Sequence, residues 1–250
     1  MINHNKYMLS IEDFNASEFI KVGSNDNIYV YKDLPLDTPI CRYIPIDYLI
    51  EMLETQKLYV ANRHSLNDKR EQGIKEDLRA IFPISPTFGK NLRKTKVEAD
   101  KISQKHKLAY SICVSCWTKH IEESIMFWNC YGNTLCRIST TIENLIESIK
   151  TTDKTIIIAP INYTNNERME SVYSKIFWKY SAYEDEQEIR LCVLANDHHI
   201  YLDVNTDILI NGILFNPFWG KSYQLFLKTS MVQKFPIFEN MIKFSHLLEN

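Results

Sequence analysis

The stretch YEDEQEIRLCVL, residues 183–194, joins an acidic run, a single arginine and an apolar strand. If residues 186–194 are extended, their side chains alternate between two faces, so Glu186, Glu188 and Arg190 share one face and apolar residues fill the other. Carboxylates this close repel each other unless a cation or a hydrogen-bond donor meets them. Taken alone, the stretch favours a strand with one solvated, charged face. A functional site is the alternative.

The composition is that of an ordinary globular protein. The chain has 250 residues, of which 45% are hydrophobic and 24% are charged, enough for one large or two small domains. It has six glycines and neither a G-x-G-x-x-G pattern nor a Walker A pattern, which argues against a glycine-rich nucleotide loop. A net charge of −2 argues against nucleic-acid binding over a broad surface, although a local basic patch remains compatible with it.

Targeting signals are missing from the sequence. The N-terminus lacks a basic start followed by an apolar core, so it does not resemble a signal peptide. No apolar run approaches the roughly 20 residues that a membrane helix needs. We therefore expect a cytoplasmic protein without membrane contact, whose six cysteines are thiols rather than disulfides.

Predicted helices and strands are mixed along the chain without strict β-α-β alternation. This pattern predicts the α+β class, with mixed or antiparallel sheets and flanking helices. We expect residues 1–38 to form an N-terminal extension packed on the core, and residues 39–250 to form a single α+β domain. A capping box of Thr140 and Glu143 predicts the start of one helix, and a further helix is expected near residues 237–248.

Three further patterns are more typical of structure than of sites. Cys113 and Cys116 have metal-ligand spacing, but a regular strand points them to opposite faces, so we predict buried thiols and no metal site. The lysine-rich segment 89–107 favours a solvated face over a phosphate-binding patch. Trp128 and Tyr131 lie on one face of a predicted helix, where core packing is the first interpretation and a stacking platform the second.

Seven short motifs occur in a fixed order: CRY at 41–43, SLNDKRE at 65–71, CVS at 113–115, WNCYG at 128–132, INY at 161–163, YEDEQEIRL at 183–191 and INGILFNP at 210–217. The ordered set resembles the bacterial domain-of-unknown-function family 2971 over about residues 40–235. The chain departs from the family pattern at Lys69 and Arg70, where proline and phenylalanine are usual, and at Tyr183, where tryptophan is usual.

The motif order is also similar to that of ADP-ribosyltransferases of the R-S-E kind, with Arg42, Ser115 and Glu186-x-Glu188 in the matching positions. This resemblance implies an ADP-ribosyltransferase-like fold and NAD as substrate. Departure of nicotinamide creates an oxocarbenium-like ribose, so a fixed carboxylate must hold the ribose hydroxyl and balance the positive charge. We expect Glu188 to supply that carboxylate and Glu186 to orient or deprotonate the acceptor. Arg42 would grip a phosphate or ribose of NAD, and Ser115 would support Glu188.

Three tyrosines, Tyr43, Tyr131 and Tyr183, are candidates to stack on the nicotinamide or on the target. The predicted function is an NAD-consuming enzyme that modifies a protein or a nucleic acid, as a toxin or phage-defence effector. The first alternative is a non-catalytic interaction domain of a bacterial defence or stress system. Arg190 leaves this alternative open, because it either supports Glu188 or neutralises it.

A metal-dependent nuclease is the weaker alternative. Its oxygen ligands would come from Asp68, Glu71, Glu186 and Glu188, since carboxylate oxygens suit magnesium. Nothing in the spacing of these four residues selects them as a set.

Overall fold

The computed structural model describes residues 9–23, 26–66, 112–130, 132, 134–165, 176–195, 197 and 199–247. The basic segment 89–107 and Tyr131 lie outside the described residues, as do Asp68 and Glu71 of the alternative metal site. In the described part of the chain, no helix is both long enough and apolar enough to cross a membrane.

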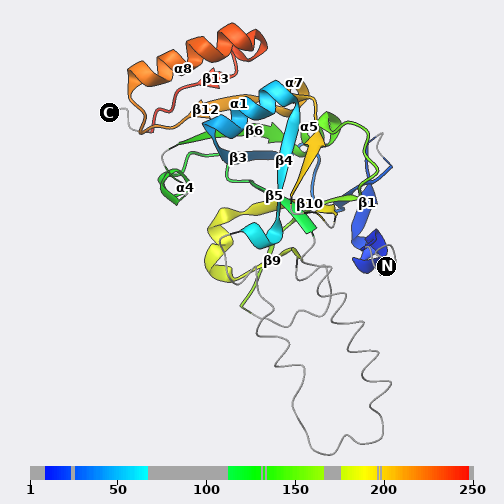
Figure 1. Cartoon of the computed structure of the whole chain (residues 1–250). Coiled ribbons are helices and arrows are strands. Elements are labelled where there is room, and N and C mark those ends of the chain that lie inside the picture. Colours follow the sequence, from blue (N-terminus) through cyan, green and yellow to red (C-terminus); the bar gives the residue numbers. More distant parts are fainter. Residues whose placement is uncertain are drawn as a thin grey trace, which may run out of the picture.

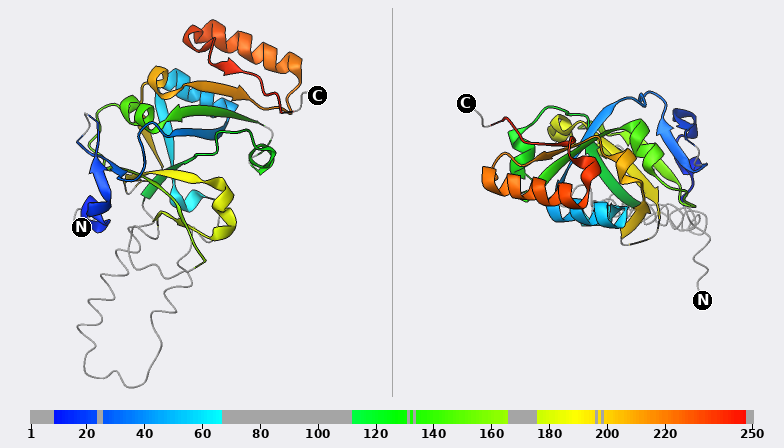
Figure 2. Two further views of the ribbon diagram at one scale, coloured as in Figure 1. Left: turned by 180° about the vertical axis from the view of Figure 1, so that it is seen from behind. Right: turned by 90° about the horizontal axis from the view of Figure 1, so that it is seen from above.

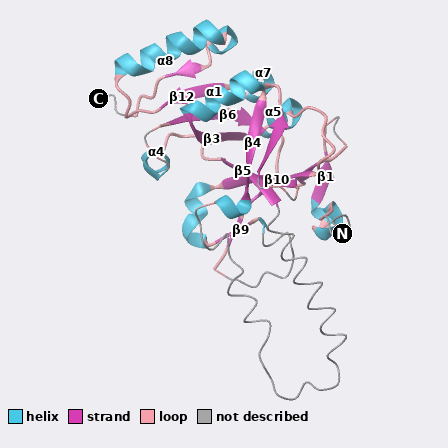
Figure 3. Cartoon of the chain, viewed as in Figure 1, coloured by secondary structure: helices cyan, strands magenta, loops and turns pink. Residues whose placement is uncertain are grey.

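One large sheet dominates the described structure, and short helices surround it (Figure 3). Its strands are β1 (Phe19–Lys21), β2 (Ile28–Tyr31), β3 (Pro39–Pro45), β4 (Lys57–Asn62), β5 (Ile112–Thr118), β6 (Leu135–Thr141), β7 (Ile156–Pro160), β10 (Glu188–Leu194), β11 (His199–Asp203), β12 (Gly212–Phe215) and β13 (Ile242–Lys243). A second, small sheet pairs β8 (Asn162–Tyr163) with β9 (Trp178–Lys179).

The α-helices are α1 (Ile46–Thr55), α4 (Ile125–Cys130), α5 (Ile142–Ser148), α7 (Thr206–Leu209) and α8 (Lys221–Lys234). Short 3-10 helices are η2 (Ile11–Asp13), η3 (Ala16–Glu18), η4 (Arg63–Ser65), η5 (Ser181–Glu186) and η6 (Pro236–Phe238). Together with a mixed and largely antiparallel sheet, these helices confirm the α+β class.

The main path of the sheet runs β1-β2-β7-β10-β5-β3-β6-β12-β13. Strand β1 and helix α8 consequently lie at opposite ends of the molecule (Figures 1 and 2). The segment expected to form an N-terminal extension supplies β1 and β2 to the sheet, because β2 pairs in parallel with β7. Phe14 and Phe19 of this segment are buried.

Strand β10, which contains the apolar part of the stretch 183–194, lies in the middle of the sheet. It pairs antiparallel with β5 on one edge and with β7 on the other, and all seven of its residues are buried. The expected solvated face is therefore wrong, since packed layers cover both sides of the strand. Glu186 also lies outside the strand: η5 ends at Glu186, and Gln187 turns the backbone with a φ of 43°.

The two faces of β10 belong to two apolar clusters. Ile189 and Leu191 pack into the larger cluster together with Trp117 of β5. Cys192 packs into the smaller cluster, on the opposite face, together with Val114 of β5. Side chains directly opposite on adjacent strands share a face, so the register of β5 and β10 fixes which residues can meet.

The sheet divides along one edge of β5. The first part of this edge pairs with β4 through Cys113 and Val114, whereas its end pairs with β3 through Thr118 alone. Between these points, the described register gives Ser115, Cys116 and Trp117 no partner strand on this edge. Strands β3 and β4 therefore diverge here, and the functional candidates gather beside the division.

Candidate active site

A cavity of about 510 Å³ lies where the sheet divides. Five predicted site residues line it: Arg42 and Tyr43 from β3, Tyr183 and Glu186 from η5, and Glu188 from the start of β10. Residues more than 140 positions apart in the sequence are thus brought to one cavity. This size falls within the range of small-ligand sites.

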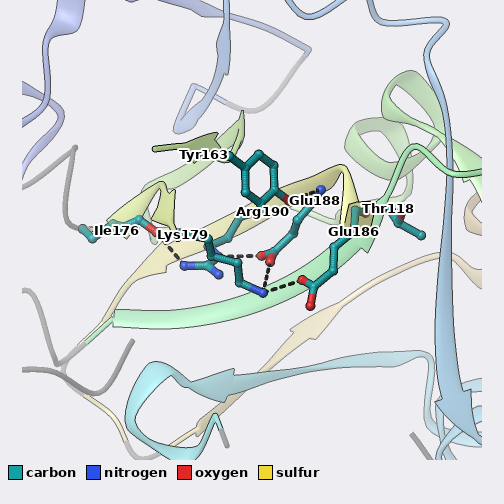
Figure 4. A network of polar contacts seen from close by, with 7 residues as sticks. All are labelled: Thr118, Tyr163, Ile176, Lys179, Glu186, Glu188 and Arg190. Atoms are coloured by element: carbon teal, nitrogen blue, oxygen red, sulfur yellow. Dashed lines mark hydrogen bonds and ion pairs between the residues drawn. The ribbon is translucent and has the colours of Figure 1, made fainter. Parts of the chain in front are cut away.

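Glu188 is the buried centre of a charge network (Figure 4). Lys179 Nζ lies 2.6 Å from Glu186 Oε2 and 2.8 Å from Glu188 Oε2, so one ammonium bridges the two carboxylates. Arg190 Nε donates a hydrogen bond of 2.7 Å to Glu188 Oε1. Both carboxylate oxygens of Glu188 therefore contact a cation.

Two opposing effects set the ionisation of Glu188. Burial raises the pKa of its carboxyl, since only 3% of the side chain is exposed. The charges and hydrogen bonds of Arg190 and Lys179 outweigh burial and lower this pKa to about 2. Glu188 is consequently a carboxylate at neutral pH.

Arg190 approaches Glu188 from the protein interior. Its side chain is fully buried, and its Nη1 donates a hydrogen bond of 2.6 Å to the backbone carbonyl of Ile176. The lining of the cavity includes Lys179, Glu186 and Glu188 but not Arg190. Arg190 thus fixes the carboxylate from behind, whereas Lys179 neutralises it on the side of the cavity.

Hydrogen bonds to the backbone hold the junction between η5 and β10. Thr118 Oγ1 donates to the Glu186 carbonyl at 2.6 Å, and the Glu188 amide donates to Tyr163 Oη at 2.8 Å. Burial raises the pKa of Tyr163, so its hydroxyl stays protonated. The two acidic residues are therefore presented from a fixed turn.

Arg42 is held by Ser115 and lies beside Trp117. Arg42 Nη1 donates to Ser115 Oγ at 2.9 Å, and Trp117 Nε1 donates to the same oxygen at 3.0 Å. The guanidinium carbon lies 6.0 Å from the centre of the Trp117 ring, within cation–π range. Burial lowers the pKa of Arg42 without removing its charge.

The expected support of Glu188 by Ser115 is not made. Ser115 lies directly opposite Leu191 in the register of β5 and β10, whereas Glu188 lies opposite Thr118. Three positions separate Ser115 from Thr118, so Ser115 faces the other side of the sheet. Ser115 therefore positions Arg42, and Thr118 is the β5 residue at the acidic turn.

The predicted stacking tyrosines differ in their surroundings. Tyr43 is stacked on Phe127, with ring centres 5.2 Å apart, and meets Trp128 edge-on at 4.7 Å. Tyr183 is partly exposed at the cavity, and Lys179 Nζ lies 5.5 Å from the centre of its ring. Tyr183 is thus the more accessible of these two rings for a ligand.

Lys179, which connects the two acidic residues, was not among the residues predicted from the sequence. The apolar positions within residues 169–180 have helical spacing, and such spacing indicates which residues are buried without indicating a partner for a lysine. The available signal was electrostatic, because two carboxylates so close to an apolar strand require more positive charge than Arg190 alone provides. Lys179 of strand β9 supplies this positive charge.

The described residues contain no group of three or more histidine, cysteine, aspartate or glutamate side chains placed to hold a metal ion. The five cysteines whose side chains are described, Cys41, Cys113, Cys116, Cys136 and Cys192, are free thiols. Cys113 and Cys116 belong to clusters on opposite faces of the sheet, as their spacing on a strand predicted.

In comparisons with known proteins, no family model matches the chain and no curated protein matches it either.

Proposed function

We propose that the chain is an ADP-ribosyltransferase-like enzyme that cleaves the glycosidic bond of NAD and transfers ADP-ribose to a protein or nucleic acid. The observation that carries this proposal is the joint position of Arg42, Glu186 and Glu188 on one cavity, with Glu188 ionised. A guanidinium suits a phosphate, and a fixed carboxylate suits a ribose that gains positive charge. Resemblance to domain-of-unknown-function family 2971 and to the R-S-E motif order supports the same conclusion.

Each residue has a task in the proposed reaction. Arg42, oriented by Ser115, binds a phosphate of NAD. Glu188 accepts a hydrogen bond from the ribose hydroxyl and balances the charge that develops as the bond from C1′ to nicotinamide breaks. Glu186 takes the proton of the acceptor as the acceptor attacks C1′. Lys179 leaves the two carboxylates when the substrate enters, because it occupies their cavity-facing oxygens.

The setting of the proposed reaction is the bacterial cytoplasm, where such an activity would serve as a toxin or a phage-defence effector. Family resemblance supports the bacterial setting.

The second candidate is a non-catalytic interaction domain. One observation favours it: both oxygens of Glu188 are already bound to cations, which weakens the carboxylate as a partner for an oxocarbenium ion. A binding domain would retain ligand contact through Arg42 and release no nicotinamide.

Release of nicotinamide separates the two candidates. The purified chain is incubated with NAD in the presence and absence of cell lysate, and free nicotinamide is measured. The wild type is expected to release nicotinamide, Glu188→Gln to lose at least about 100-fold of the rate, and Glu184→Gln to behave as wild type. Glu184 is the matched control, since it lies exposed in the same 3-10 helix.

Two results would reject catalysis. The first is wild-type silence under all conditions while circular dichroism reports an intact fold. The second is equal rates in the wild type and Glu188→Gln, which would show that the carboxylate has no part in bond cleavage. NAD binding without release in both proteins would support the interaction domain.

A further inference from the structure

A second cavity, of about 300 Å³, lies on the other side of β3. Alternate residues of β3 divide between the two cavities: Cys41 and Tyr43 line only the first, and Ile44 lines only the second. Arg42 lines both. The second cavity is bounded by β3, β4, β11 and the helix α1, which lies beside β4 (Figure 1).

Four aromatic side chains surround this cavity: Tyr48 from α1, Tyr59 from β4, and His199 and Tyr201 from β11. We name them the tyrosine–histidine cluster. Tyr59 lies at its centre, with ring-centre distances of 6.2 Å to Tyr48, 5.6 Å to His199 and 5.5 Å to Tyr201. The residues of the cluster therefore come from two strands and one helix that surround the second cavity.

The outer rings of the cluster are open to solvent. Tyr48 is 52% exposed and Tyr201 is 44% exposed, although both touch other rings. Cross-strand packing of Tyr59 against Tyr201 is edge-on, with an angle of 62° between the ring planes. It leaves uncovered aromatic surface around a cavity, which is the arrangement on which nucleobases stack.

The charge at this cavity favours an anion. Arg42 uses Nη1 on Ser115 and has no carboxylate partner among the described residues. Lys57 also lines the cavity, and the single acidic residue in its lining is Glu51. Because the Arg42 side chain is partly buried, an anionic ligand would gain more from its guanidinium than from a fully exposed cation.

We propose that the second cavity binds a nucleotide, with its base on the tyrosine–histidine cluster and its phosphate on Arg42 and Lys57. The cavity volume lies at the lower end of small-ligand sites and suits one nucleotide unit. Glu51 provides an acceptor for an exocyclic amino group of the base. This site goes beyond the proposed cleavage of NAD and does not rest on it: Arg42 is shared with the first cavity, but none of the aromatic residues lines that cavity.

Binding of adenosine monophosphate to the full chain tests the site by isothermal titration calorimetry. The wild type is expected to bind, and Tyr201→Ala is expected to raise the Kd about tenfold, the scale of one lost base stack. Tyr223→Ala is the matched control and should leave the Kd unchanged, because Tyr223 is 46% exposed but lies on α8. Tyr201→Leu keeps an apolar side chain in the strand and should weaken binding as Tyr201→Ala does.

Three further measurements locate the ligand and identify its source. Adenosine without phosphate should bind at least about tenfold more weakly if Arg42 and Lys57 hold the phosphate. Glu188→Gln should bind adenosine monophosphate as wild type does, because Glu188 lines the first cavity only. A short oligodeoxyadenylate that binds more tightly than the mononucleotide identifies nucleic acid as the source, and equal or weaker binding identifies the free nucleotide.

The proposal is overturned if the folded wild type does not bind adenosine monophosphate, or if Tyr201→Ala and Tyr201→Leu bind as tightly as Tyr223→Ala. It is also overturned if Glu188→Gln abolishes binding while circular dichroism reports a folded variant, which would place the nucleotide in the first cavity. Nucleotide binding that depends on Tyr201, in a chain that releases no nicotinamide, would preserve this site and reject the proposed enzyme.

Discussion

Glu188 is ionised although only 3% of its side chain is exposed. A buried carboxylate with no partner takes up a proton, because the charged form loses its hydration. Here Arg190 and Lys179 contact one oxygen each and favour the charged form. Among the described residues, these ion pairs join two carboxylates, Glu186 and Glu188, to two cations, so their formal charges balance.

The charge network makes the free energy of unfolding depend on pH in the acidic range. Because the folded-state pKa of Glu188 lies near 2, below its ordinary value of 4.5, the folded state binds fewer protons than the unfolded state between these values. The stabilisation from Glu188 is complete above about pH 4.5 and is lost as the pH falls towards 2. The free energy of unfolding, measured in urea, should therefore exceed that of Glu188→Gln at pH 6, and the difference should shrink on acidification.

Glu184→Gln is the control for this titration, because Glu184 is exposed. Its difference from wild type should stay small across the range. A constant difference between wild type and Glu188→Gln from pH 6 to pH 2 would contradict the lowered pKa of Glu188.

At the scale of elements, the turn between η5 and β10 decides how the acidic residues are presented. Gln187 has a φ of 43° and closes η5 through its amide, which donates to the Glu184 carbonyl at 3.0 Å. Left-handed backbone is unfavourable for residues with a Cβ and natural for glycine. The turn separates Glu186 from the strand, so the two carboxylates reach Lys179 from different elements.

Gln187→Gly should stabilise the protein by up to about 1 kcal/mol, since it removes the cost of the left-handed backbone. Gln56 is the contrast, with a φ of 56° at the end of α1. Its side chain donates to Thr206 Oγ1 and accepts from the Thr206 amide. Gln56→Gly should therefore destabilise by about 1 kcal/mol or more. Urea unfolding of both variants would test the pair, and equal stabilisation by both would contradict it.

Element boundaries show what local patterns can predict. The helix predicted from the capping box of Thr140 and Glu143 is α5, but its N-cap is Thr141, whose Oγ1 accepts from the Asn144 amide, rather than Thr140. The helix expected near 237–248 is wrong: η6 and the strand β13 lie there, since β13 pairs with β12. Pairing with a distant strand overrides local spacing, and spacing alone cannot reveal it.

Burial of β10 was also beyond local prediction. The alternation of charged and apolar residues correctly indicated a strand with two different faces. Alternation does not indicate what covers the charged face. Here β7 and β5 flank the strand, and the segment before it supplies Lys179. The motif order predicted that Arg42 and Glu188 belong to one site, and both line the first cavity. The partner of Ser115 depends on the register of β5 and β10, which no sequence motif encodes.

At the scale of the whole molecule, one continuous sheet connects the N-terminal strand β1 to the C-terminal strand β13. The division of this sheet beside β5 opens the first cavity without separating the two parts, because β5 keeps pairs with both β3 and β4. Arg42 lies where the two parts diverge and reaches both cavities. A ligand in either cavity therefore meets the same cation.

The continuous sheet predicts a single cooperative unfolding transition. Tryptophan fluorescence reports on sites that include Trp117 on β5 and Trp219 before α8, and far-ultraviolet circular dichroism reports on the whole backbone. The two signals should give coincident urea transitions, as expected for one domain. Two separated transitions would contradict the predicted single domain.

Glu188 and Arg190 meet through the pleat of one strand, two residues apart. Breaking a buried ion pair by removing one partner typically costs about 3–5 kcal/mol. Evolution can therefore replace the pair in one concerted exchange far more easily than through either single intermediate. In diverging descendants of this chain, we expect the two positions to change together, so that glutamate and arginine are inherited as one unit.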